Sequence, residues 1–87
     1  MTEKILFSLD QCIKCIQTKQ LLKNREDITV ITFPHEIYNW SSEHRSKAEE
    51  YNLIDELQRI APVLWVDGKK YFGYLRIRKW LDDNPQD

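Results

Sequence analysis

The stretch FSLDQCIKC, residues 7–15, decides the fold of this chain because it places two cysteines where a strand passes into a helix. An apolar run predicts a strand over residues 4–9 with both faces covered. Good helix formers follow, and we predict a helix over residues 12–24. Cys12 and Cys15 are therefore expected about one turn apart at the start of that helix.

The predicted helix carries its own start and stop signals. Asp10 or Ser8 is expected to cap its first turn, and Asn24 is an acceptable end. The face that we expect to be buried contains residues spaced by three and four positions: Cys15, Thr18 and Leu22.

The middle of the chain predicts a strand and a helix. Residues 28–33 are almost all β-branched, which is typical of a strand. Ser41 and Ser42 offer an N-cap to a helix that runs to about residue 51. The segment 53–60 has spaced apolar residues and is either a further helical turn or a packed loop.

The last third of the chain predicts a hairpin and a closing helix. Asp67-Gly68 is a strong two-residue turn signal between strands at residues 63–66 and 69–72. A helix over residues 75–82 follows. The predicted fold class is α/β, with the order β-α-β-α-β-β-α and a four-stranded mixed sheet that has helices on both faces.

Composition and charge exclude several classes of protein. Residues 1–87 are expected to form one domain, because this length leaves no room for a second core. The hydrophobic share of 41% is too high for a disordered chain, and no uncharged stretch is long enough to span a membrane. A net charge of -1 argues against a nucleic-acid partner or a polybasic membrane surface. The N-terminus lacks the features of a secretory signal, so we expect a cytoplasmic protein, and we expect it to be a monomer.

The cysteine count narrows the chemistry. Two cysteines are too few for a disulfide framework or for a zinc site made of cysteines alone. At a helix start, unpaired amides and the helix dipole stabilise a thiolate on Cys12, which makes it a nucleophile at neutral pH. Cys15 can reach the Cys12 sulfur as the resolving thiol, and Lys14 adds positive charge between them.

Two other interpretations of the cysteine pair remain open. The cysteines can be inert core residues, or half of a metal site that His35 and His44 complete. The two histidines are nine positions apart, which is wider than the spacing usual in zinc sites of two cysteines and two histidines. The strand-to-helix junction favours a redox pair.

The aromatic residues are expected to serve mainly as core. Tyr38 and Trp40 lie in a predicted loop, where they either cap the core or form a docking patch, and we favour capping. The residues expected inside the core are Trp65, Phe72 and Trp80.

A proline directly precedes the strand at residues 63–66. By itself, Pro62 ends a helix or begins a strand. Near a redox helix, a cis Ala61–Pro62 bond would leave the Ala61 N–H and C=O free to pair with an extended substrate.

Two segments of the chain resemble the glutaredoxin branch of the thioredoxin superfamily: residues 7–22, FSLDQCIKCIQTKQLL, and residues 61–81, APVLWVDGKKYFGYLRIRKWL. The resemblance runs over nearly the whole chain and implies a thioredoxin-like fold. The positions that match the family's nucleophile, resolving cysteine, cis-proline and glycine before the last helix are Cys12, Cys15, Pro62 and Gly73.

The resemblance implies a dithiol–disulfide oxidoreductase that needs no bound cofactor or metal. Its electrons would come from glutathione, or from NADPH through thioredoxin reductase, and would pass to protein disulfides. NrdH-type redoxins and small phage glutaredoxins are the subgroups most similar to the chain, and both supply electrons to ribonucleotide reductase. The residues expected to contact the substrate are Lys14, Ala61, Pro62 and Gly73.

The chain departs from the family pattern at several places, among them Ile60-Ala61-Pro62, where Thr-Val-Pro is usual. Ile13 and Lys14 replace the proline and the aromatic residue that are usual between the cysteines. Before the last helix, the sequence Phe72-Gly73-Tyr74 lacks the first of two glycines, and the acidic residues that hold glutathione in the family are missing. The alternative function is a non-catalytic module that holds a metal or an iron–sulfur cluster, or docks a partner.

Overall fold

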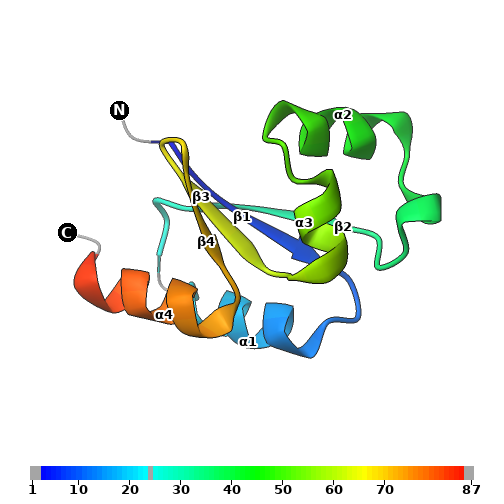
Figure 1. Ribbon diagram of the computed structural model, residues 1–87. Coiled ribbons are helices and arrows are strands. Elements are labelled where there is room, and N and C mark those ends of the chain that lie inside the picture. Colours follow the sequence, from blue (N-terminus) through cyan, green and yellow to red (C-terminus); the bar gives the residue numbers. More distant parts are fainter. Residues whose placement is uncertain (1–2, 24, 86–87) are drawn as a thin grey trace.

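Strand β1 (Lys4–Leu9) is an inner strand of a four-stranded sheet in the computed structural model of this chain (Figure 1). Its neighbours are the parallel strand β2 (Thr29–Phe33) and the antiparallel strand β3 (Val63–Val66), and β4 (Lys69–Phe72) pairs with β3 at the edge. Because β1 is paired on both sides and covered on both faces, most of its residues are buried. The structure describes residues 3–23 and 25–85.

Helices cover both faces of the sheet (Figure 1). Helices α1 (Ile13–Leu21) and α4 (Tyr74–Asp83) lie on one face, and α2 (Ser42–Glu50) and α3 (Ile54–Arg59) lie on the other. A short 3-10 turn, Ile37–Asn39, precedes α2. Within the described ranges, no helix combines the length and the apolar character that a membrane crossing requires.

The hydrophobic core is divided by the sheet into two clusters. Side chains alternate along β1, so that Ile5 and Phe7 belong to one cluster while Leu6 belongs to the other. The cluster under α2 and α3 contains Ile5, Phe7, Phe33, Trp40, Ala48, Leu53, Leu57 and Val63. The cluster under α1 and α4 contains Leu6, Leu22, Ile28, Leu64, Ile77 and Leu81. The prediction of a sheet with both faces covered is therefore confirmed.

The first turn of α1 is capped by Cys12, and the prediction of a cap at Asp10 or Ser8 is wrong. The Cys12 sulfur accepts a hydrogen bond from the backbone N–H of Cys15. Ser8 is still part of β1, and its hydroxyl donates to the Ile31 carbonyl across the β1–β2 pair. Asp10 is exposed in the turn that follows the strand.

The buried face of α1 agrees with the prediction. Cys15, Thr18 and Leu22 are all buried, as their spacing indicated. The helix is shorter than predicted, because Leu22 is already its C-cap residue. Asn24, the predicted end, lies outside the described residues.

The segment 53–60, which the sequence left open, forms helix α3. Leu53 is its N-cap residue, and Leu57 is buried in the core. Asn52 separates α2 from α3 with a φ of 57°, a left-handed conformation that asparagine tolerates better than most residues. The predicted N-cap of α2 is confirmed at Ser41, whose hydroxyl accepts a hydrogen bond from the backbone N–H of His44.

The hairpin between β3 and β4 is confirmed at the predicted turn. Asp67 and Gly68 both have positive φ, 48° and 92°, as a two-residue turn of type I′ requires. The closing helix begins at Tyr74, one residue before the predicted start.

The two loop aromatics have different environments. Trp40 is buried against Phe33, and its ring N–H donates to the Pro34 carbonyl at 2.8 Å, so the expected packing on the core is confirmed. The same prediction is wrong for Tyr38, which is 74% exposed. The three aromatics expected in the core are partly buried and packed against the two clusters: Trp65, Phe72 and Trp80.

One acidic and two basic side chains tie the start of β1 to the segment before β2. The guanidinium of Arg25 donates to the Asp27 carboxylate at 3.1 and 2.8 Å, and Lys4 Nζ lies 3.0 Å from the same carboxylate. The hydrogen bonds from Arg25, and then from Lys4, hold the pKa of Asp27 well below its usual range.

Asp27→Asn is therefore expected to lower the free energy of unfolding at about pH 7 by about 1 kcal/mol. Because the pKa of the carboxylate is depressed in the folded state, its stabilisation is present above the unfolded pKa, near ~4, and is lost as pH falls toward the folded value. Urea denaturation at about pH 7 and about pH 3 measures this, and the deficit should shrink at the lower pH. Asp82→Asn, at an exposed site, is the control; an equal loss there would contradict the prediction.

Candidate functional site

Cys12 lies where the chain turns from β1 into α1. The turn passes through Gln11, whose φ of 56° is in the left-handed region, and Cys12 is the N-cap residue. Its Sγ accepts a hydrogen bond from the backbone N–H of Cys15 at 3.2 Å. The partly exposed sulfur thus occupies the position of a capping oxygen, where the amide and the helix dipole favour negative charge.

Cys15 lies one turn further along α1 and is fully buried. The backbone N–H of Leu9, at the end of β1, donates to its Sγ at 3.4 Å. Burial, followed by the hydrogen bond with Cys12, raises the pKa of Cys15 to about 12. Both cysteines are free thiols, so the structure is that of the reduced pair. The two sulfurs therefore differ in exposure and in hydrogen bonding.

Pro62 lies beside the end of β1, because Val63 pairs with Phe7 in the sheet. The Ala61–Pro62 peptide bond is cis, and Pro62 is fully buried. Across residues 3–23 and 25–85, the N–H and C=O of Ala61 have no hydrogen-bond partner. These two groups are available to an extended segment of another molecule.

Gly73 joins this edge of the sheet to the start of α4. Its N–H donates to the Pro62 carbonyl at 3.0 Å, and its φ of 87° is one that glycine adopts without strain. A Cβ at this position would lie 3.9 Å from the Ile60 side chain. The glycine is therefore required by its backbone conformation more than by lack of space.

Lys14 connects the starts of α1 and α4. Its Nζ lies 5.7 Å from the centre of the Tyr74 ring, a cation–π distance, and the side chain is exposed. Of the predicted substrate-binding residues, the structure brings Ala61, Pro62 and Gly73 together and places Lys14 beside the residue that follows Gly73.

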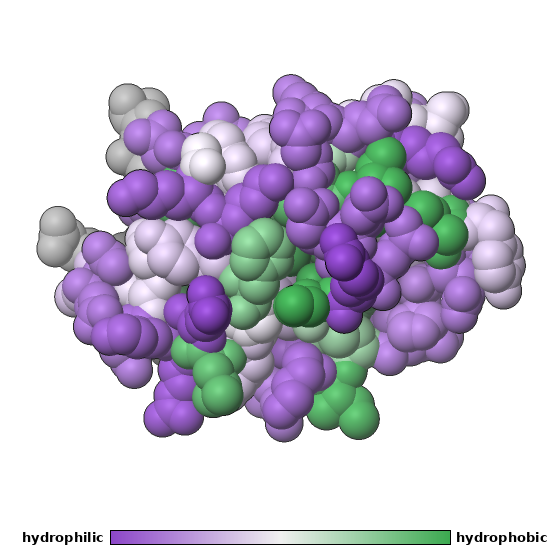
Figure 2. Space-filling model, in the orientation of Figure 1, coloured by the Kyte–Doolittle hydropathy of each residue, from purple (hydrophilic) through white to green (hydrophobic). Residues whose placement is uncertain are grey.

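Three exposed apolar side chains lie beside predicted site residues in the sequence, and the sequence prediction did not include them. Ile13 and Leu75 are each 74% exposed, and Ile60 is about half exposed. They come from the starts of α1 and α4 and from the residue before Ala61. Figure 2 shows that apolar groups on the molecular surface are separated by hydrophilic ones. The sequence signal for these exposed apolar residues was Ile13, which stands between the two cysteines at the start of the helix.

The two histidines do not join the cysteines. His35 Nδ1 lies 3.1 Å from the Asp10 carbonyl, and His44 contacts Ser41 at the start of α2. Among the described residues, no group of three or more histidine, cysteine, aspartate or glutamate side chains could hold a metal ion. The geometry gives no support to a metal site shared by the cysteines and histidines.

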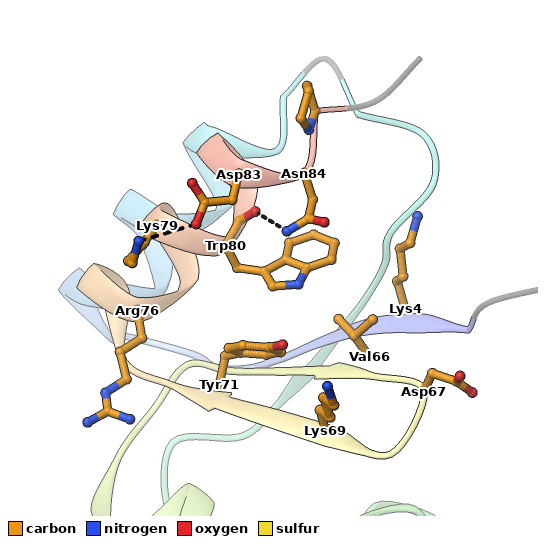
Figure 3. A pocket seen from close by; sticks show the side chains of 11 residues that line it. Lys4, Val66, Asp67, Lys69, Tyr71, Arg76, Lys79, Trp80, Asp83 and Asn84 are labelled. Atoms are coloured by element: carbon orange, nitrogen blue, oxygen red, sulfur yellow. Dashed lines mark hydrogen bonds and ion pairs between the residues drawn. The ribbon is translucent and has the colours of Figure 1, made fainter.

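A separate cleft of about 960 Å³ opens at the other end of the sheet, between the β3–β4 hairpin and the C-terminal half of α4 (Figure 3). Tyr71 and Trp80 lie close together in it, with ring centroids 6.1 Å apart. Two of its cations, Lys4 and Lys79, are already in ion pairs. Neither cysteine lines this cleft, so we assign no redox chemistry to it.

The chain matches no protein-family model, and a search of curated proteins finds no relative. It does resemble solved structures. The solution structure of the dithiolic glutaredoxin 2-C-Grx1 from Trypanosoma brucei brucei has 23% sequence identity and a TM-score of 0.60, over 94% of this chain and 78% of that one. The crystal structure of glutaredoxin 1 from Francisella tularensis, complexed with cacodylate, has 14% identity and a TM-score of 0.57, over 95% of each chain.

These two structures show the fold of the chain, which is the glutaredoxin form of the thioredoxin-like fold. The predicted fold class is confirmed. The predicted order lacked the short helix α3, which the sequence left open, and the 3-10 turn before α2.

Proposed function

We propose that this chain, whose fold is that of the glutaredoxins, is a dithiol–disulfide oxidoreductase that reduces protein disulfides. The observation that carries the proposal is the asymmetry of its cysteine pair. Cys12 is partly exposed at a helix start and accepts a backbone hydrogen bond, while Cys15 is buried one turn behind it. The partly exposed Cys12 thiol suits attack on the disulfide of another molecule, and the buried Cys15 thiol suits attack on Cys12 within the chain.

In the first step, the Cys12 thiolate attacks one sulfur of the substrate disulfide. A Cys12–substrate S–S bond forms as the substrate S–S bond breaks, and the second substrate sulfur leaves as a thiolate. The Cys15 N–H and the helix dipole stabilise the attacking thiolate. Because the pKa of Cys15 is raised to about 12, its thiol stays protonated and does not compete for the substrate.

In the second step, Cys15 gives its proton to solvent and attacks the Cys12 sulfur. The Cys12–Cys15 disulfide forms, and the bond between Cys12 and the substrate breaks. The chain has then lost two electrons to the substrate disulfide, and the two substrate thiolates take their protons from solvent, which has received those of the cysteines.

We expect the substrate to lie along the edge of the sheet beside the cysteines. The unpaired N–H and C=O of Ala61 would pair with an extended segment that carries the disulfide. Pro62 and Gly73 would contact that segment, and Lys14 would contact its polar groups. The exposed side chains of Ile13, Ile60 and Leu75 offer apolar contacts that a protein substrate could use and a small polar one could not.

The oxidised pair requires two electrons from a reductant, either glutathione or NADPH through thioredoxin reductase. The start of α4 presents Tyr74, Leu75 and Arg76, so it offers no carboxylate to the amine of glutathione. We therefore favour thioredoxin reductase as the reductant. Ribonucleotide reductase is proposed as the target only because the chain resembles NrdH-type redoxins and small phage glutaredoxins. The proposal is of a monomer in the cytoplasm that holds no metal.

Thioredoxin reductase with NADPH is expected to reduce the oxidised chain faster than glutathione does, because the start of α4 offers no carboxylate to the amine of glutathione. The two reductants are compared side by side, with thiol formation at the cysteines as the measurement. Arg76→Asp restores an acid at the start of α4, and it should raise the rate with glutathione alone.

Other outcomes have defined meanings. Faster reduction by glutathione would contradict the assignment of the reductant. If wild type reduces no protein disulfide and purified protein carries stoichiometric metal or a visible absorption band, the function is that of a binding module.

A further inference from the structure

One ammonium group and two hydroxyl groups form a hydrogen-bonded network between α1 and the β1–β2 pair. Lys19 Nζ donates to Thr32 Oγ1 at 3.0 Å, and Thr32 Oγ1 lies 3.0 Å from Ser8 Oγ. Ser8 donates its single hydrogen to the Ile31 carbonyl at 3.3 Å. Thr32 must therefore donate to Ser8, which leaves its oxygen free to accept from Lys19. The donor and acceptor of every hydrogen bond in this network are thus determined. They are consistent with a charged Lys19 as the first donor.

This network holds a positive charge on the face of α1 that carries the buried thiol. Lys19 follows Cys15 by four residues, so both lie on the same face of α1, toward the sheet. The Lys19 side chain is half-buried, and its attachment to Thr32 limits its motion. The charge of Lys19 lowers the pKa of Cys15, opposite to the effect of burial.

We propose that Lys19, held in place by Thr32 and Ser8, is a positioning residue that promotes attack by Cys15 in the second step. The proposal rests on the function proposed above. It assigns to Lys19 an effect on the resolving thiol and none on the first attack by Cys12.

The second step is where this charge matters most. In the reduced protein, Cys12 raises the pKa of Cys15 through a hydrogen bond and through charge repulsion. Both effects depend on a free Cys12 sulfur, and they end when that sulfur enters the mixed disulfide. Burial of Cys15 is then opposed by the Leu9 N–H and by Lys19. The Leu9 N–H has the larger effect of the two, but Lys19 is the one that a side-chain substitution can remove.

Other charged groups near the pair do not replace Lys19. Asp10 and Lys14 flank the cysteines in sequence, but both are exposed, and neither contributes to the pKa of Cys15. His35 is also exposed and contacts the Asp10 carbonyl. The strands next to the thiol contribute neutral groups, namely the Leu9 amide of β1 and the Thr32 hydroxyl of β2.

The test uses dithiobis-nitrobenzoate, a symmetric aromatic disulfide that releases a coloured thiolate. Attack by Cys12 forms a mixed disulfide and releases one coloured thiolate. Attack by Cys15 on that mixed disulfide forms the Cys12–Cys15 disulfide and releases the second. The two rates are read from the two phases of colour in a single-turnover experiment, and Cys15→Ser should show only the first phase.

Lys19→Met is expected to slow the second phase about tenfold at neutral pH and to change the first phase by less than about twofold. The pH profile of the second phase should move upward. Lys19→Arg should restore most of the rate, because it returns the charge. Lys23→Met removes one charge from an exposed position one turn further along the chain, and it should leave both phases unchanged.

Thr32→Val supplies a test that keeps the charge and the side-chain volume. It removes the acceptor of Lys19, and it should slow the second phase about threefold without slowing the first. This variant decides the matter if Lys19→Met folds poorly.

Failure of this proposal differs from failure of the proposed function. If wild type shows two phases and Lys19→Met leaves the second unchanged, or slows both phases equally, the role of Lys19 is overturned. An equal slowing in Lys23→Met has the same meaning. If wild type shows no second phase, the proposed function itself is contradicted.

Discussion

Cys12→Ser is expected to abolish reduction of protein disulfides, with a loss of about a thousandfold or more. A serine hydroxyl is not ionised at neutral pH and cannot form the mixed disulfide on which the second step depends. The measurement is the rate at which the reduced chain opens a protein disulfide in a single turnover.

The fold should tolerate this substitution. Cys12 is the N-cap residue of α1, and serine is one of the residues preferred at that position. The stability of the variant, measured in urea, should therefore equal or exceed that of wild type, so that a loss of activity reports on chemistry alone.

Cys15→Ser is the matched control for the second sulfur. It should keep the first attack and stop at a mixed disulfide between Cys12 and the substrate, which mass spectrometry detects. If Cys12→Ser keeps the activity of wild type, or if the mixed disulfide forms on Cys15, the assigned roles are wrong.

Phe33→Ala is expected to lower the free energy of unfolding by about 3 to 5 kcal/mol. Phe33 is fully buried at the end of β2, where its ring lies 6.1 Å from that of Phe7 and 4.8 Å from that of Trp40. A domain of this length has about 4 to 13 kcal/mol of total stability, so the variant should be partly or wholly unfolded. Urea denaturation monitored by circular dichroism measures the loss.

Two control substitutions separate the effect of lost buried volume from that of removing any aromatic ring. Phe33→Leu keeps most of the apolar volume and should cost less than about 2 kcal/mol. Tyr38→Ala removes an aromatic ring that is largely exposed, and should change stability by less than about 0.5 kcal/mol. A cost of Phe33→Ala no larger than that of Tyr38→Ala would contradict the packing described here.

Local sequence signals predicted most of the fold. The apolar run at the start of the chain predicted β1, and Asp67-Gly68 predicted the hairpin, because each depends on a few adjacent residues. The position of the cysteines at a strand-to-helix junction was predicted in the same way. Helix α3 was left open because six residues are too few for a clear helical period.

Features that depend on distant partners were not predictable from local patterns. The cap of α1 was assigned to Asp10 or Ser8, although Ser8 bonds to β2, more than twenty positions away. Tyr38 and Trp40 have similar sequence environments, but only Trp40 packs against Phe33. A local pattern contains no information about which of two neighbouring aromatics reaches the core.

The sequence by itself determined the order of most elements and the presence of a cysteine pair at a helix start, because these follow from periodicity and turn chemistry within short segments. The helical spacing also indicated that Cys15 is buried, but only the tertiary structure decided which groups surround its sulfur. Cys15 is fully buried in the folded chain, and the Leu9 N–H at the end of β1 donates to its sulfur. Thr32 of β2 holds the Lys19 ammonium group on the face of α1 that carries Cys15. Burial and charge are properties of surroundings, and the surroundings of this pair come from segments far apart in the chain.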